Sequence, residues 1–224
     1  MISRSHSIAC VRSGFGIVAV ATLLYGCSSE SGTDISDLWK IAKISLGSDD
    51  QEVTLQQAAS TPYASIGVRL GKNPQQILVL ASDNGQQQLW TSAARIAVLT
   101  QNGRVIRTAG LPKNLSGFAP RAGQQIAPIA GNSVSYLADF ADMGAYSIEV
   151  SCHAVAAGAE SINILGATIN ADHVDEECLA PKIGWAFTNS YWVDPSGKIT
   201  WRSIQHFHPE TDPVEIVTLR PIAG

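Results

Sequence analysis

Short segments of alternating apolar and polar residues follow one another along most of the chain after residue 62. Such alternation is typical of β-strands that bury one face. Turn-forming residues separate several segments, and Asp83-Asn84-Gly85, Gln101-Asn102-Gly103 and Asp194-Pro195-Ser196-Gly197 each predict a hairpin. The strands predicted in this way are 63–70, 76–82, 86–92, 95–100, 104–109, 134–140, 146–155, one or two within 162–174, 185–193, 198–207 and 214–219.

Roughly ten short strands joined by turns predict an all-β fold, an antiparallel domain that is either barrel-like or a sandwich. Residues 111–131 are rich in Pro, Gly, Gln and Ala and are predicted to form a long loop. The acidic run 172–177 is predicted to be a solvated loop that leads to Cys178. One amphipathic helix is predicted at 35–46, because its apolar residues recur at helical spacing. The chain from residue 34 to 224 is therefore predicted to be a single β-rich domain.

The N-terminal segment has the features of a bacterial lipoprotein signal peptide. Arg4 and Arg12 precede an apolar run at 15–24, and Cys27 follows Gly26. We expect residues 1–26 to be removed and Cys27 to be acylated as the new N-terminus. The alternative is an ordinary signal peptide that ends near a cysteine. A membrane span is disfavoured because spanning takes about 20 apolar residues.

The predicted anchor determines where the protein is located. Acyl chains such as palmitate on Cys27 would attach it stably to a membrane. Residues 27–33 are small and polar, which is typical of a flexible tether. In enteric-type bacteria an Asp after the lipidated cysteine holds a lipoprotein at the inner membrane. Ser28 therefore favours the outer membrane, with the domain facing the periplasm.

Composition and charge exclude one large class of partner. The chain is 45% hydrophobic and 15% charged, which indicates a folded protein. Without Arg4 and Arg12, 13 Lys and Arg side chains remain against 19 Asp and Glu, a formal charge of −6. No run of basic residues occurs, so nucleic acid is excluded as a partner because phosphate binding needs a basic face.

The cysteines predict a disulfide bond. Cys10 would leave with the signal peptide and Cys27 would carry lipid, so Cys152 and Cys178 remain in an oxidising compartment. Pairing them is the simplest arrangement. Two buried free thiols or a metal site are the alternatives, and the lack of a C-x-x-C pair argues against the metal.

Sequence motifs for catalysis or cofactor binding are absent. The chain holds no P-loop, no dinucleotide fingerprint and no nucleophile elbow after the signal peptide. His206 and His208 are the best metal candidates, but no third ligand lies near them in sequence. We therefore predict no catalytic residue, no metal and no cofactor.

Tryptophan, arginine and glutamine side chains gather in the predicted hairpin strands. An indole offers a flat apolar face to a sugar ring, and arginine and glutamine donate hydrogen bonds to hydroxyls or carboxylates. The alternative is that the tryptophans belong to the core while the arginines close the rim of the barrel. The residues predicted to include a glycan- or partner-binding surface are Trp90, Arg104, Arg107, Trp192, Trp201, Arg202 and Gln205.

These residues also carry a family resemblance that covers nearly the whole mature chain. The chain resembles the YjbF/GfcB-type (YmcC-like) outer-membrane lipoproteins. The Ala/Gly-rich stretch 154–159 and the pair of cysteines depart from the family pattern. The motifs that carry the resemblance are Leu38-Trp39, Thr61-Pro62-Tyr63-Ala64-Ser65, Leu89-Trp90-Thr91-Ser92, the strings 103–111 (G-R-V-I-R-T-x-G-L) and 189–194, and the string 197–205 that includes W-R-S-x-Q, with Pro209.

The resemblance implies a β-rich, barrel-like domain and a place in the export of an exopolysaccharide or capsule. The expected partners are the membrane, through the lipid anchor, and the polysaccharide or the envelope proteins that export it. The leading hypothesis is a lipoprotein that assists assembly or export without catalysis. An enzyme that modifies or cleaves the polysaccharide and a purely structural envelope adaptor are the alternatives.

Overall fold

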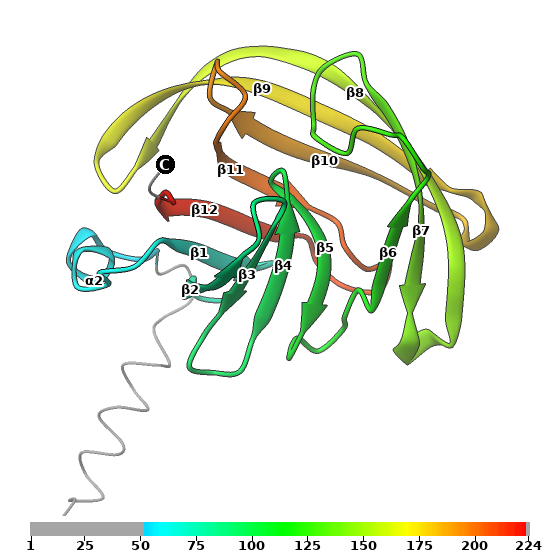
Figure 1. Cartoon of the computed structure of the whole chain (residues 1–224), viewed down its shortest axis with the longest axis horizontal. Coiled ribbons are helices and arrows are strands. Elements are labelled where there is room, and N and C mark those ends of the chain that lie inside the picture. The colour runs from blue at the N-terminus through cyan, green and yellow to red at the C-terminus, as the bar shows by residue number, and fades with distance from the viewer. Residues whose placement is uncertain (1–51, 223–224) are drawn as a thin grey trace, which may run out of the picture. The chain divides into compact units, whose positions relative to one another are not determined.

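Twelve antiparallel strands form one continuous sheet that curls into a nearly closed barrel (Figure 1). The computed structural model describes residues 52–222. The strand order is β5-β4-β3-β2-β1-β12-β11-β10-β9-β8-β7-β6, so nearly every strand pairs with its neighbours in the chain. The predicted all-β class is confirmed, and the barrel is the form observed.

The elements have the following bounds. Before the sheet lies α2 (Leu55–Ala59). The first strands are β1 (Ser65–Leu70), β2 (Gln76–Asp83), β3 (Gln87–Thr91), β4 (Ala97–Gln101), β5 (Arg104–Ala109) and β6 (Gly117–Pro120). They are followed by β7 (Ser133–Phe140), η1 (Ala141–Met143), β8 (Ala145–Ile164), β9 (Ala167–Ala180), η2 (Pro181–Ile183), β10 (Trp185–Val193), β11 (Thr200–Gln205) and β12 (Val214–Arg220).

The turn between β4 and β5 shows how local sequence sets the hairpins. Asn102 and Gly103 both have positive φ, 52° and 77°, as a tight two-residue hairpin turn requires. Gly103 is also needed for a close approach, because a Cβ there would lie 2.1 Å from Thr200 Oγ1. The absence of a side chain thus lets this turn reach β11 on the other side of the barrel.

Two segments that the sequence predicted to be loops, 111–131 and 172–177, contain strands, so both predictions are wrong. The predicted loop 111–131 contains β6, which pairs with β7 in the register Gly117↔Asp139 to Pro120↔Tyr136. Because β6 has no sheet partner beyond β7, Pro120 removes no ladder hydrogen bond there. The acidic run 172–177 is part of β9 and not a loop. Glu176 faces the interior, where a buried arginine compensates its charge.

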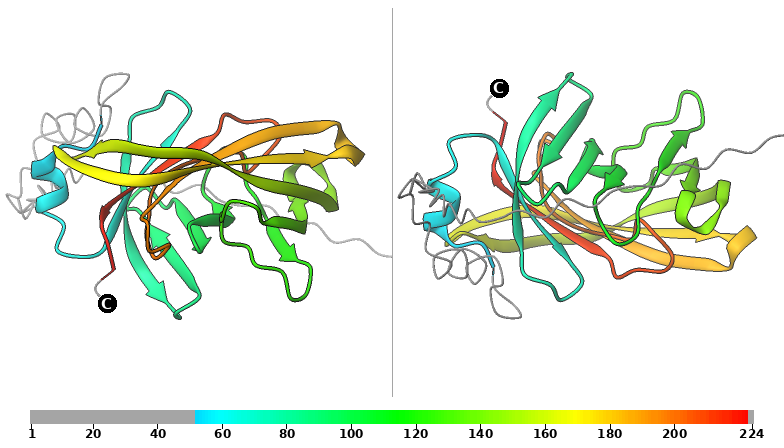
Figure 2. Two further views of the ribbon diagram at one scale, coloured as in Figure 1. Left: turned by 90° about the horizontal axis from the view of Figure 1, so that it is seen from above. Right: turned by 90° about the horizontal axis from the view of Figure 1, so that it is seen from below.

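The hairpin of β8 and β9 is longer than the sequence indicated. Its strands have 20 and 14 residues, and Gly166 lies in the turn between them with φ 85°. β7 pairs with β8 only as far as His153, so the rest of the hairpin extends past that strand. Figures 1 and 2 show this extension, drawn in yellow, arching over β10 to β12.

Apolar residues form two separate clusters. The main core fills the barrel and includes Leu78, Val98 and Phe140, each fully buried. The second cluster lies where the β8–β9 hairpin covers the outer face of β10 to β12, and it joins Ile162 and Ile164 to Trp192. We call it the outer cluster.

Several predictions concern residues outside the described range. The helix at 35–46, the signal peptide 1–26, the tether 27–33 and lipidation at Cys27 all lie before residue 52. Within residues 52–222, no helix is long and apolar enough to cross a membrane.

Candidate functional site

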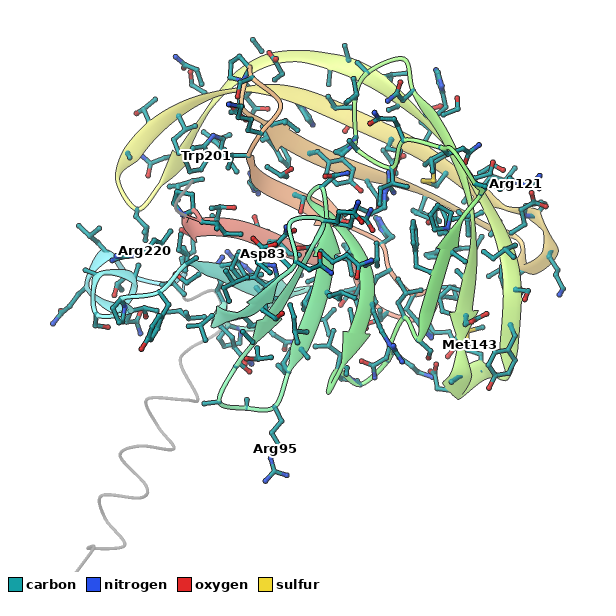
Figure 3. All side chains as sticks on the ribbon, viewed as in Figure 1. Asp83, Arg95, Arg121, Met143, Trp201 and Arg220 are labelled. Carbon is teal, nitrogen blue, oxygen red and sulfur yellow. A yellow bond between two sulfur atoms is a disulfide. The ribbon has the colours of Figure 1, made fainter. Side chains whose placement is uncertain are left out.

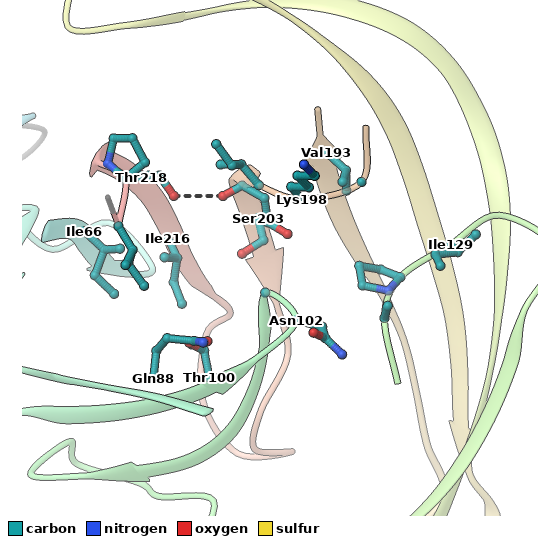
Figure 4. A pocket seen from close by; sticks show the side chains of 18 of the residues that line it. Ile66, Gln88, Thr100, Asn102, Ile129, Val193, Lys198, Ser203, Ile216 and Thr218 are labelled. Carbon is teal, nitrogen blue, oxygen red and sulfur yellow. Dashed lines mark hydrogen bonds between the residues drawn. The ribbon is translucent and has the colours of Figure 1, made fainter. Parts of the chain in front are cut away.

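The barrel has a cavity of about 530 Å³ at one end, which we call the mouth cavity (Figure 4). It is bounded by the turns after β2, β4 and β10, by the loop that leads to β7, and by the end of β12. Trp90 on β3 and Ile66 on β1 form part of its wall. A concave site with an aromatic wall is the usual setting for a small ligand.

Neutral hydrogen-bonding groups line much of this cavity. Some are already paired, since Trp90 Nε1 donates to Thr100 Oγ1 at 2.9 Å and Thr218 Oγ1 donates to the Thr200 carbonyl at 2.8 Å. Such a mixture of hydroxyls, amides and aliphatic surface can accommodate both the polar edge and the C–H face of a sugar. The neutral polar side chains in the lining are Gln88, Thr100, Asn102, Gln125, Thr200, Ser203 and Thr218.

Gln205 does not itself line the mouth cavity but lies behind its floor and holds two of the lining residues in place. Its side-chain nitrogen donates to the Gly103 carbonyl and to Ser203 Oγ, both at 2.8 Å, and both partners line the cavity. Its side-chain oxygen accepts from the Val105 amide at 2.9 Å and from the Tyr191 hydroxyl at 3.3 Å. The side-chain oxygen and nitrogen of Gln205 are thus both hydrogen-bonded, and only 2% of the residue is exposed. Gln205 therefore connects β5 to β11 across the interior.

Beneath this floor, Arg104 and Glu176 form a buried ion pair. Arg104 Nη1 donates to Glu176 Oε2 at 2.8 Å, and Nη2 donates to Oε1. Arg104 Nε donates to the Ile126 carbonyl at 3.0 Å, and Asn189 Nδ2 donates to Glu176 at 3.2 Å. The charges are therefore fully hydrogen-bonded, as a buried pair must be to offset the loss of water.

The surroundings of this ion pair affect the protonation of its neighbours. Burial lowers the pKa of Arg104, but the interactions with Tyr191 and Glu176 outweigh burial and raise it above its ordinary value. Burial raises the pKa of Tyr191 and of Tyr136 well above the usual range. Arg104 therefore stays charged and both phenols stay neutral at physiological pH.

Trp192 belongs to the outer cluster and both faces of its indole are occupied. The ring of His173 stacks on it with centroids 4.4 Å apart, and the guanidinium of Arg202 lies 4.7 Å from its centroid. His173 and Arg202 lie on β9 and β11, which flank β10 on opposite sides. Trp192 Nε1 donates to Glu160 Oε2 at 2.7 Å. This tryptophan therefore offers no free face to a sugar.

The remaining predicted residues lie away from the cavity. Trp201 is half-buried in the outer cluster beneath the β8–β9 hairpin (Figure 3). Arg202 donates from Nε and Nη2 to Glu215, both at 2.7 Å. Arg107 is exposed on β5 and does not line the mouth cavity. Of the seven predicted residues, the structure thus places Trp90 in the cavity wall, whereas Gln205 and Arg104 are buried behind residues that line it.

The cysteines of β8 and β9 lie directly opposite each other. Cys152 pairs with Cys178 in the strand register, and the structure joins their sulfur atoms in a disulfide. Within residues 52–222, one group of three candidate metal ligands comes together, namely Cys152, Cys178 and Glu176. Since the disulfide uses both sulfurs and Arg104 holds the carboxylate, this group does not form a metal centre.

Sequence reasoning missed most of the residues that line the mouth cavity. Asn102 and Ser203 lay within or beside the quoted motifs, but their neutral side chains attracted no functional interpretation. A signal was present, because Gln88 and Trp90 share one face of a strand, Thr100 on the next strand pairs with Gln88, and Asn102 follows in the turn. Polar residues that continue the buried face of a strand indicate a solvent-filled end of a barrel.

Comparisons with known proteins agree with this architecture. The YjbF family, described as "Group 4 capsule polysaccharide lipoprotein gfcB, YjbF", matches residues 37–219. Lipoprotein GfcB of Escherichia coli (strain K12) is 26% identical over 77% of this chain and 84% of its own length. Lipoprotein YjbF of the same organism is 23% identical over 91% of this chain and 96% of its own length.

A solved structure is also similar. The crystal structure of the hypothetical lipoprotein YmcC from Escherichia coli (K12) matches with a TM-score of 0.67 at 24% identity. The match covers 87% of this chain and 100% of the other, and it shows a shared fold. The chain belongs to the YjbF family of group 4 capsule polysaccharide lipoproteins, which confirms the family resemblance drawn from its motifs.

Proposed function

We propose that this protein is an outer-membrane lipoprotein that assists the assembly or export of an extracellular or capsular polysaccharide. It acts without catalysis, by holding a segment of the glycan in the mouth cavity. The observation that carries the proposal is the lining of that cavity, which combines Trp90 with neutral hydroxyl and amide groups. The chain belongs to a family whose description names a capsule polysaccharide, and this supports the choice of a glycan as the ligand.

The residues that line the cavity are suited to binding a saccharide and not to hydrolysing it. A site that binds a saccharide needs an apolar surface for its C–H groups and donors and acceptors for its hydroxyls. Hydrolysis of a glycosidic bond also requires a pair of carboxyl groups across that bond. The residues of the described chain that line the mouth cavity include no Asp and no Glu.

The test compares two glutamine variants. Gln88 and Gln125 line the cavity, whereas Gln86 is exposed in the turn after β2 and does not. In full-length protein in detergent, Gln88→Ala combined with Gln125→Ala should weaken binding of oligosaccharides from the cognate polysaccharide about tenfold, because two hydrogen-bonding groups are lost. The matched control Gln86→Ala should bind like the wild type.

The same variants are then placed in cells that lack the wild-type protein. The double variant should reduce surface polysaccharide while the amount of lipoprotein in the membrane stays normal. The oligosaccharides should be recovered unchanged after incubation with the protein. If the wild type binds no oligosaccharide, the proposal that the protein contacts the glycan is wrong. Normal export of polysaccharide by the double variant would instead favour an adaptor that contacts other envelope proteins.

A further inference from the structure

The mouth cavity carries an uneven distribution of charge. Lys198 is the one charged side chain among the described residues that line it. The whole chain, by contrast, has 19 Asp and Glu against 15 Lys and Arg. A lone cation in a lining that contains no Asp or Glu favours a ligand that carries a negative charge at the matching position.

The position of Lys198 leaves its ammonium group available. It lies in the exposed turn between β10 and β11, and it makes no salt bridge with any acid in residues 52–222. Asp194, in the same turn, is already used, because its carboxylate accepts from the amides of Ile199 at 2.6 Å and Ser196 at 3.2 Å. These hydrogen bonds outweigh the effect of burial and lower the pKa of Asp194.

Exposed apolar side chains lie elsewhere on the rim of the mouth cavity. Ile129, in the loop before β7, is 52% exposed, and Ile222, after β12, is 39% exposed. These exposed aliphatic groups can cover the C–H face of a sugar. Hydroxyl groups lie deeper, at Thr100 and Ser203, where they match sugar hydroxyls and not an acyl chain.

We infer that the mouth cavity takes an acidic sugar, a hexuronic acid residue of the glycan, with its carboxylate against Lys198. This inference rests on the proposed function and narrows it to a class of saccharide. The chain's overall negative charge opposes long-range attraction of a polyanion. Recognition of the acid therefore depends on this local contact, and Lys198 determines the preference between acidic and neutral sugars.

The test uses two probes that differ in one group. The first is a short oligosaccharide that contains glucuronic acid, and the second is the same molecule with its carboxyl reduced to an alcohol. With the full-length protein in non-ionic detergent at low salt, the acidic probe should bind about fivefold more tightly than the reduced probe. Added salt should diminish this difference, because exposed charges are screened.

The variant Lys198→Gln should bind the two probes equally and keep the wild-type melting temperature. Lys182→Gln is the matched control, since Lys182 is exposed in η2 and does not line the cavity. It removes the same charge from the chain and should keep the fivefold preference. Glucose 1-phosphate serves as a third probe, and preferential binding of this phosphate over the uronic acid would overturn the inference.

The other outcomes are also decisive. Equal binding of both saccharides by the wild type, or a preference that survives in Lys198→Gln, overturns the acidic-sugar inference while the proposed glycan contact stands. If neither saccharide binds while oligosaccharides of the cognate polysaccharide do, the acidic-sugar inference fails alone; if those do not bind either, both proposals fail. Displacement of a fluorescent fatty acid from the cavity without saccharide binding would assign it to an acyl chain instead.

Discussion

At the scale of single residues, the ion pair between Arg104 and Glu176 has the clearest consequence for stability. Both side chains are almost fully buried, 3% and 2% exposed, so neither charge can be hydrated if its partner is lost. We predict that Arg104→Ala lowers the free energy of unfolding by about 3–5 kcal/mol, because Glu176 keeps a buried charge without compensation. Chemical denaturation of the purified protein measures this loss.

Arg107 provides the matched control three positions further along the same strand. It is exposed and forms no ion pair within residues 52–222, so Arg107→Ala should change stability by less than about 0.5 kcal/mol. Combining Arg104→Met with Glu176→Leu should recover part of the loss, because no unpaired charge remains. Equal stability of both alanine variants would show that the ion pair does not hold the barrel together.

The lowered pKa of His206 makes the stability of the folded protein depend on pH. Burial lowers its pKa below the ordinary value of about 6.5. Between these two pKa values the unfolded chain binds the proton and the folded chain does not, so stability falls as the pH drops below about 6.5. His206→Gln should remove this part of the decline. The unfolding free energies of wild type and variant, measured from pH 7.5 to 5, should change in parallel above pH 7 and diverge below it; parallel curves throughout would contradict the prediction.

At the scale of elements, the hairpin turns were the most predictable feature and buried charge the least. Asn102 and Gly103 announce a turn by their own conformational preferences, and β5 and β10 have the predicted bounds. The acidic run in β9 was misread because it looks solvated when considered locally. The partner of Glu176 is Arg104, 72 residues earlier, and no local pattern reveals that pairing.

The candidate site was only partly predictable for a related reason. Strand alternation gives the face of a side chain only while the register is regular. Trp192 pairs with Arg202 and Val193 with Thr200, so Trp201 is an extra residue in a bulge. Trp192 and Trp201 lie in the outer cluster, whereas Trp90 lies in the wall of the mouth cavity. The predicted tryptophans therefore do not form one surface.

The disulfide predicted from the cysteine count acts on the β8–β9 hairpin. Cys152 and Cys178 are 26 residues apart, and the bond closes the whole hairpin extension into a loop. On the chain-entropy model, the loss of this closure in Cys152→Ala with Cys178→Ala should lower the free energy of unfolding by about 3 kcal/mol. Reduced wild type should lose a similar amount. Free thiols at both positions in protein made in the periplasm, seen by non-reducing peptide mapping, would refute the bond.

At the scale of the whole molecule, side chains help to close the barrel where the strand ladder does not, between the outermost strands β5 and β6. β5 and β6 are the two outermost strands of the sheet, and the contact between their ends is made by Thr108 and Leu115, whose amides donate to the Leu115 carbonyl and to Thr108 Oγ1, both at 3.0 Å. Arg104 and Gln205 then tie β5 to β9 and β11 through the interior. Arg104 and Gln205, two of the residues predicted to bind glycan, therefore also hold in place the residues around the mouth cavity.

The lipid anchor predicted at Cys27 would determine in which membrane this site operates. Cys27→Ala removes the thiol that would be acylated, so the protein should accumulate as an unprocessed precursor in the inner membrane or be released in soluble form. Cys10→Ala is the matched control, because Cys10 lies within the predicted signal peptide and its loss should leave processing intact. Fractionation of the membranes, with mass spectrometry of the N-terminal peptide, measures both variants. If Cys27→Ala still fractionates with the outer membrane as the wild type does, the lipid is not the anchor, and a protein contact must hold the barrel there.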